Sequence, residues 1–155
     1  MEFDLAMTDE LLATTRSVRK RLDLEKPVPR EVIEACVALS QQAPTGTNSQ
    51  TWRWVVVEDQ AKRDAIADAY RKMAGPYLEA QGKIAAASGD AQTVRVLDSA
   101  VYLAENLQKV PVHVIPCLQG RPPEGTPVMG MAAMMASIFP AVWSFQIALR
   151  ARGLG

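Results

Sequence analysis

Residues 43–52 read A-P-T-G-T-N-S-Q-T-W and form the most informative stretch of the sequence. Pro44 and Gly46 interrupt regular structure, and most other positions carry a hydrogen-bond donor or acceptor. A loop of this composition is suited to binding a flat, polar group. Upstream, Arg16-Ser17-Val18-Arg19 combines two guanidinium groups with a hydroxyl, and these groups bind phosphate well. The two segments together predict a site for a phosphorylated cofactor.

Length and composition favour one globular domain. The chain has 155 residues, of which 48% are hydrophobic and 22% charged, which is enough to bury a sizeable core. Lysine and arginine number 17 together, as do aspartate and glutamate, so no overall basic field favours nucleic acid. We therefore expect no nucleic-acid partner, and we expect any charged ligand to be recognised locally.

The N-terminus and the cysteines indicate a cytoplasmic protein. Residues 1–10 are acidic and lack the basic and apolar regions of a secretory signal. By inspection, no segment is long and apolar enough to span a bilayer, so we expect no membrane association. Cys36 and Cys117 lie far apart among apolar neighbours, which is typical of buried free thiols in a reducing compartment.

Two strands are predicted from aromatic and β-branched residues. Residues 52–57 are expected to form a buried strand. Residues 112–115 form the second, and Pro116 indicates a position at a sheet edge or at a bulge.

Helices are predicted over most of the remaining chain. Gly75-Pro76 is expected to end one of them, leaving the Ala-rich residues 77–88 as a separate helical stretch. Gly153 is expected to cap the last helix in a left-handed conformation. The other expected helices are a short one capped by Thr8, one beginning after Pro27 and Pro29, and residues 59–73, 91–107 and 140–152.

Four motifs follow one another in a distinctive order. T-R-S-V-R-K-R-L at residues 15–22 and P-V-P-R-E at 27–31 precede A-P-T-G-T-N-S-Q-T-W-R-W-V-V-V at 43–57, and P-A-V-W-S-F-Q-I-A-L-R-A-R-G-L-G follows at 140–155. In this order the motifs resemble the flavin-dependent nitroreductase family. The chain departs from the family at Thr15, where a second arginine is common, and at Thr51, where proline is usual.

The resemblance implies an α+β fold, specifically an α-β-α sandwich with a mostly antiparallel sheet. It also implies a homodimer with FMN at the interface, contacted by both subunits. Only two strands are predicted here, whereas a sheet generally needs three or more to be stable alone. Because the chain stops at Gly155, directly after a helix cap, we expect a single nitroreductase-like domain over residues 1–155 that is C-terminally truncated, without its last strands and extension.

Ten residues match cofactor-binding positions of the family. The basic segment resembles the family's residues that bind the FMN phosphate and ribityl chain. The loop resembles those that contact the isoalloxazine and ribityl groups. The start of the late helix resembles the positions that approach the flavin from the second subunit. Lys20 or Arg21 can add positive charge near the phosphate. The ten residues are Arg16, Ser17 and Arg19 in the basic segment, Pro44, Thr45, Gly46, Asn48 and Gln50 in the loop, and Pro140 and Ala141 in the late helix.

Taken without the resemblance, each of these segments also fits a purely structural interpretation. The basic segment can be a solvated charged turn, the loop can be a polar connector, and Pro140 can begin a helix without contacting a ligand. Residues Met129, Met131, Met134 and Met135 fit adaptable apolar packing or the mouth of a hydrophobic substrate site. His113 has no acidic or cysteine partner at metal-ligand spacing, so we expect no metal site.

The activity implied by the resemblance is that of an FMN-dependent oxidoreductase. NAD(P)H would reduce the flavin and leave, and a nitroaromatic, quinone or similar electron acceptor would take its place, in a ping-pong hydride transfer. The flavin carries this chemistry, so no dedicated catalytic residue is expected. The alternative is a truncated, non-catalytic protein of the same fold that binds flavin or a partner.

Overall fold

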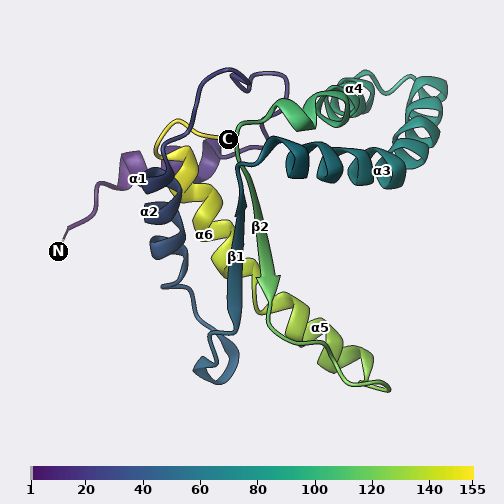
Figure 1. The fold of residues 1–155 in the computed structure, drawn as a ribbon. Helices are drawn as coiled ribbons and strands as arrows, with labels where there is room; N and C mark the ends of the chain where they lie inside the picture. Colours follow the sequence, from purple (N-terminus) through teal and green to yellow (C-terminus); the bar gives the residue numbers. More distant parts are fainter. Residues whose placement is uncertain (1) are drawn as a thin grey trace. The chain divides into compact units, whose positions relative to one another are not determined.

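The computed structural model describes residues 2–155, except for the side chain of Thr47. This part of the chain divides into two compact units, unit 1 with residues 2–17, 28–56 and 114–155, and unit 2 with residues 18–27 and 57–113. The elements of unit 1 are α1 (Leu5–Thr14), α2 (Arg30–Ser40), η1 (Gly46–Asn48), α5 (Val128–Ala136) and α6 (Phe139–Arg150), and those of unit 2 are α3 (Gln60–Ser88), α4 (Ala91–Asn106) and η2 (Leu107–Lys109). The strands β1 (Trp52–Val57) and β2 (His113–Leu118) pair with each other and belong to unit 1 except for Val57 and His113 (Figure 1).

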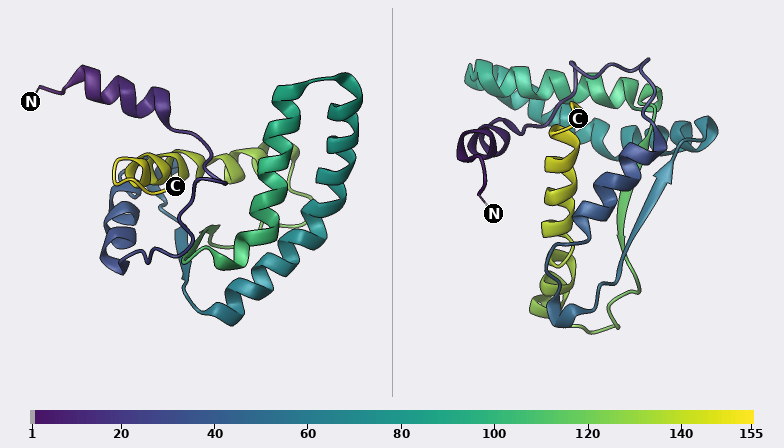
Figure 2. Two further views of the ribbon diagram at one scale, coloured as in Figure 1. Left: turned by 90° about the horizontal axis from the view of Figure 1, so that it is seen from above. Right: turned by 90° about the vertical axis from the view of Figure 1, so that its left-hand side faces the viewer.

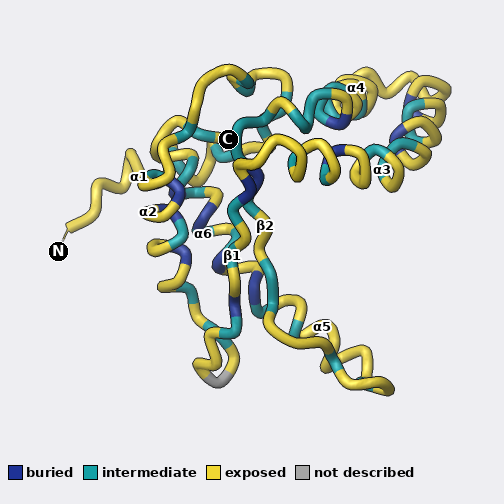
Figure 3. The backbone as a smooth tube through the Cα atoms, viewed as in Figure 1, coloured by how far each residue is buried: buried dark blue, intermediate teal, exposed yellow. Residues whose placement is uncertain are grey.

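The core of unit 1 is built where α6 runs beside the strands, and Figure 3 shows the buried residues gathered there. Trp54 packs against Phe145 with ring centroids 5.0 Å apart, and Cys36 of α2 completes this cluster. Trp52 packs against Ala141 in a second cluster. Because alternate residues of a strand share one face, both indoles of β1 reach α6.

The two strands are antiparallel, and their register explains how β2 accommodates a proline. The backbone N–H of Gln119 donates to the carbonyl oxygen of Thr51 at 2.9 Å, which places Trp54 opposite Pro116 in a non-hydrogen-bonded pair. The nitrogen of Pro116 therefore points away from β1, and its missing N–H costs no bond in the ladder. The predicted edge position of this proline is confirmed. β1 is less buried than predicted, since Val55 is exposed.

The predicted end of a helix at Gly75-Pro76 is wrong, because α3 continues through both residues to Ser88. A proline in a helix interior removes one backbone hydrogen bond and costs about 3 kcal/mol. Leu78 and Ala85, beyond the proline, are buried, and α3 packs along α4 as an antiparallel pair (Figure 2). The packing of the two helices therefore outweighs the local preference of the sequence.

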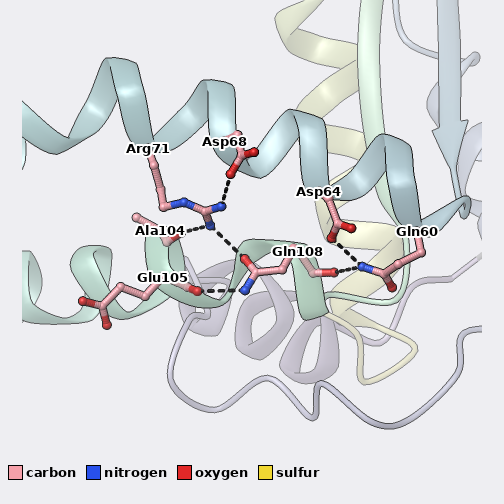
Figure 4. Close-up of polar contacts among 7 residues, drawn as sticks. All are labelled: Gln60, Asp64, Asp68, Arg71, Ala104, Glu105 and Gln108. Atoms are coloured by element: carbon pink, nitrogen blue, oxygen red, sulfur yellow. Dashed lines mark hydrogen bonds and ion pairs between the residues drawn. The ribbon is translucent and has the colours of Figure 1, made fainter.

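A set of polar side chains on α3 binds the end of α4 and the following η2 (Figure 4). Arg71 Nη1 donates to the carbonyl oxygen of Ala104 at 3.1 Å and to Gln108 Oε1 at 2.9 Å. Gln60 Nε2 donates to the carbonyl oxygen of Gln108 at 3.1 Å, and Arg63 Nη1 donates to that of Val110 at 2.5 Å. The last carbonyl groups of a helix have no hydrogen-bond donor within that helix. The side chains of α3 supply donors to carbonyl oxygens in this part of the chain.

The remaining helices begin and end close to their predicted limits, with two exceptions. α1 begins at Leu5 rather than after Thr8, because Asp4 Oδ1 accepts a bond from the N–H of Met7 at 3.0 Å and acts as the N-cap. α5 lies in a segment for which no helix is predicted. α2, α4 and α6 are confirmed to within two residues, and Gly153 has the expected left-handed conformation, with φ of 72°.

The prediction that no segment is long and apolar enough to span a bilayer is wrong when the criteria are helix length and composition. The run Val128–Arg150, formed by α5 and α6 in succession, has 23 residues, and the mean hydropathy of its most apolar window is 1.6, with 17% of that window buried. About 20 apolar residues suffice for a span. Core helices of soluble proteins pass the same test, so the run alone is weak evidence for a membrane segment.

Replacing Phe145 by alanine is expected to lower the free energy of unfolding by about 3 kcal/mol, because the ring is buried against Trp54. Denaturant unfolding followed by far-UV circular dichroism measures the change. Phe3→Ala is the matched control, since Phe3 is 71% exposed and its loss should change stability by less than about 0.5 kcal/mol. Equal effects of the two substitutions would contradict this description of the core.

Candidate functional site

The loop between α2 and β1 is held by hydrogen bonds among its own residues. The N–H of Asn48 donates to the carbonyl oxygen of Thr45, and the N–H of Ser49 to that of Gly46, each at 3.2 Å. The side chain of Gln50 donates through Nε2 to Asn48 Oδ1 at 3.1 Å. Asn48, Ser49 and Gln50 are all exposed, so the loop presents amide and hydroxyl groups from a defined backbone.

Asn48 and Gln50 adopt left-handed backbone conformations, with φ of 54° and 44°. They are the only residues other than glycine with positive φ in the part of the chain that the structure describes. Asparagine tolerates this region, whereas glutamine adopts it at a cost of about 1 kcal/mol or more. Two such residues in one short loop mark a strained segment, and strain of this kind clusters at functional sites.

The space around Gly46 is open. Apart from its two chain neighbours, a Cβ atom built on Gly46 would meet no heavy atom of the described residues within 4 Å, and its φ is not positive. Neither the backbone conformation nor packing within the described chain therefore requires glycine here. A position without a side chain lets a flat ligand approach the backbone closely.

The start of α6 joins the same part of unit 1. Ala43, at the beginning of the loop, packs in one cluster with Trp52 and Ala141. Ala141 is fully buried, whereas Pro140 is exposed in the first turn of α6. The structure thus brings Ala43, next to Pro44, and Ala141, next to Pro140, into one cluster of unit 1. Of the two predicted site residues on α6, only Pro140 is exposed.

The basic segment is divided between the two units. Arg16 and Ser17 are exposed at the end of the first stretch of unit 1, and Arg16 Nη1 donates to the carbonyl oxygen of Thr15 at 2.8 Å. Arg19 belongs to unit 2 and is half-buried, with Nη1 donating to Ser99 Oγ at 3.3 Å. Lys20 forms an ion pair with Asp98. Two of the predicted cations are therefore held by α4.

A hollow of about 360 Å³ lies beside the loop in unit 1. Gln50 is the one predicted site residue that lines it. Trp52 and Trp54 also line it, and their indole nitrogens are buried without a hydrogen-bond partner in the described part of the chain. The remaining lining residues are Val37 of α2, Gln41 directly after α2 and Arg53 of β1. They are not among the predicted site residues, because no sequence motif distinguishes them.

The other candidate side chains have structural roles. His113 is 9% exposed, and its Nε2 lies 2.9 Å from the carbonyl oxygen of Leu107. Cys36 and Cys117 are free, as predicted, although only Cys36 is fully buried. Burial raises the pKa of the Cys36 thiol, and the charge of Arg152 partly opposes this effect. Within residues 2–155, no three His, Cys, Asp or Glu side chains are grouped to hold a metal ion.

Comparison with known proteins identifies relatives at the level of family and fold. The model of a family described as the nitroreductase family matches residues 12–155. A nitroreductase-like protein from Bacillus cereus is 16% identical with a TM-score of 0.61 over 100% of this chain and 70% of its own. The FMN-dependent nitroreductase NfnB from Mycobacterium smegmatis, solved with NADPH, is 22% identical with a TM-score of 0.60 over 97% and 73%.

An iodotyrosine deiodinase solved with FMN and 3-iodo-L-tyrosine is 23% identical with a TM-score of 0.61 over 93% of this chain and 70% of its own. At these identities the likenesses establish the fold. No protein of curated function matches the chain.

Replacing Gln50 by glycine is expected to raise the free energy of unfolding by about 1 kcal/mol, because glycine adopts positive φ without steric cost. Gln41→Gly is the matched control: Gln41 has φ of −70° at the end of α2, so the same change there should lower stability. Both are measured by denaturant unfolding. A destabilised Gln50→Gly variant would show that the loop carries no strain at this residue.

Proposed function

This chain belongs to the nitroreductase family, and from that premise we propose that it is an FMN-dependent oxidoreductase. In this proposal NAD(P)H is the reductant, and a nitroaromatic, quinone or similar compound is the electron acceptor, the two occupying one site in turn. The observation that carries the proposal is the strained, exposed loop at Asn48 and Gln50, which is the loop that resembles the flavin contacts of the family.

The loop is chemically suited to an isoalloxazine ring. The edge of that ring alternates hydrogen-bond donors and acceptors, and the amide groups of Asn48 and Gln50 offer both. Thr45 adds a hydroxyl, and the open space at Gly46 leaves room for close approach of the ring to the backbone.

The basic segment is suited to the phosphate of FMN. Arg16 and Arg19 supply planar guanidinium groups that can each donate two parallel hydrogen bonds, and Ser17 supplies a hydroxyl. The exposure of Arg16 and Ser17 keeps them available for a ligand. Pro140, exposed at the start of α6, is proposed to approach the flavin of a second subunit, with Ala141 packed behind it.

In this proposal the cofactor and the protein have different roles. When bound, FMN supplies the hydride-transfer chemistry. The chain binds the phosphate and orients the ring through the loop amides. No side chain of the described site is required as a general acid or base.

The fold alone does not select the acceptor. A nitroreductase and a deiodinase both match this chain at closely similar TM-scores, and one fold can host several activities. The choice therefore rests on the side chains around the flavin. Both cysteines are free, which supports the proposal of a cytoplasmic location, where thiols stay reduced.

We further propose that the functional unit is a homodimer. Large apolar residues remain exposed on both α5 and α6, with Val128 at 81%, Met135 at 59%, Phe139 at 63% and Trp143 at 46%. Val128 and Met135 lie seven residues apart in α5, and Phe139 and Trp143 lie four apart in α6, so each pair shares one face of its own helix. Contiguous apolar surface of this kind is typical of an interaction site, and a second copy covering it would place both subunits at the start of α6.

Replacing Arg19 by alanine is expected to weaken FMN binding about ten- to a hundredfold, because a charge-assisted hydrogen bond contributes about 1.5–3 kcal/mol. Riboflavin, which lacks the phosphate, should bind the wild type and the variant equally. Quenching of flavin fluorescence measures both affinities.

The matched control for this substitution is Arg121→Ala, which removes the same charge from an exposed position after β2. It should leave both affinities within about twofold. A wild-type protein that binds neither flavin would overturn the proposed function. Flavin binding without any oxidation of NADH or NADPH would instead identify a non-catalytic flavin-binding protein.

Replacing Met135 by glutamate is expected to convert the dimer to a monomer, because it buries a charge in the proposed interface. Sedimentation velocity measures the change. Met73→Glu is the control, since Met73 is 83% exposed on α3 of unit 2, and this variant should remain dimeric. A monomeric wild type, or dissociation by both substitutions, would contradict the proposed interface.

A further inference from the structure

Two residues of α4 hold two cations of the basic segment within unit 2. Arg19 Nη1 lies 3.3 Å from Ser99 Oγ, and Lys20 Nζ forms an ion pair with Asp98 Oδ2. The two α4 residues are adjacent in sequence but 78 or more positions beyond their partners. The segment is therefore fastened to α4 at two successive residues.

The two contacts differ in their effect on charge. The hydroxyl of Ser99 donates to the carbonyl oxygen of Val96 at 2.7 Å, so its lone pair is left to accept from Arg19. This bond orients the guanidinium and keeps its full positive charge. Asp98 instead places a negative carboxylate directly against Lys20, which cancels the field of that ammonium group.

The ion pair is weak enough to be displaced. The side chains of Lys20 and Asp98 remain 48% and 64% exposed, and exposed pairs of this kind contribute about 0–1 kcal/mol. A phosphate dianion carries about twice the charge of a carboxylate and more acceptor oxygens, so it competes effectively for the same ammonium group.

We infer that Asp98 and Ser99 of α4 set the affinity of the basic segment for the flavin phosphate, Asp98 as a competing counter-charge and Ser99 as a positioning residue for Arg19. This inference rests on the proposed function, which supplies the phosphate. Asp98 lowers the affinity because the ion pair must open before Lys20 can meet the phosphate. Ser99 raises it by holding Arg19 in one orientation before the ligand arrives.

Asp98→Asn tests the counter-charge, and Glu105→Gln is its matched control. Glu105 lies seven residues further along α4 and is exposed, and its carboxylate forms no ion pair in the described part of the chain. Flavin-fluorescence titration of Asp98→Asn should show FMN bound about three- to tenfold more tightly than by wild type. Riboflavin binding should not change, and Glu105→Gln should match wild type for both flavins. The gain should shrink as salt is added.

Ser99→Ala tests the positioning role. It should weaken FMN binding about threefold or more while riboflavin binding is unchanged, and Ser99→Thr, which keeps the hydroxyl, should restore it. A residue with a merely structural role would affect both flavins alike and would show no rescue by threonine.

A flavin-free measurement tests the ion pair itself. Trypsin cleaves after arginine and lysine, so the segment should be cut faster in Asp98→Asn than in Glu105→Gln, because the segment opens from α4 more often. Equal cleavage rates would overturn the inference at its first step.

The titrations separate this inference from the proposed function. If wild type binds FMN more tightly than riboflavin but Asp98→Asn gains nothing over Glu105→Gln, the inference is wrong and the proposed function stands. If neither wild type nor Asp98→Asn binds FMN, both are wrong.

Discussion

The packing of the two β1 indoles against α6 is the constraint on which unit 1 depends. Trp54 contacts Phe145 and Trp52 contacts Ala141, so two successive residues on one strand face fix the strand to the helix. The loop that precedes β1 is thereby anchored at its end. Its strained conformation at Gln50 persists because the packing on either side outweighs a local cost of about 1 kcal/mol.

Unit 2 shows a different balance, in which polar contacts complete what packing begins. Side chains of α3 donate to the carbonyl oxygens of Ala104, near the end of α4, and of Gln108 in the following η2. Further back along α4, Ser99 and Asp98 hold Arg19 and Lys20. α4 is therefore both a packing partner and a charged surface. If its ion pair controls phosphate affinity, flavin binding is tuned by a residue that never contacts the ring.

Much of the fold could be predicted from the sequence, because capping residues and periodicity act locally. α2, α4, α6 and both strands follow from such signals. The continuation of α3 through Pro76 could not be predicted, since it depends on burial of Leu78 beside α4. The loop residues were found by motif order, but the contacts of Arg19 and Lys20 join positions about 80 residues apart, and no local pattern marks Asp98.

The most direct test of the central claim is reconstitution with FMN, removal of free flavin by gel filtration, and addition of NADPH or NADH without oxygen. The account predicts that the flavin's visible absorbance elutes with the protein, is bleached by one of the two nucleotides and returns when a quinone or nitroaromatic is added. Protein that elutes colourless, or colour that neither nucleotide bleaches, would contradict it.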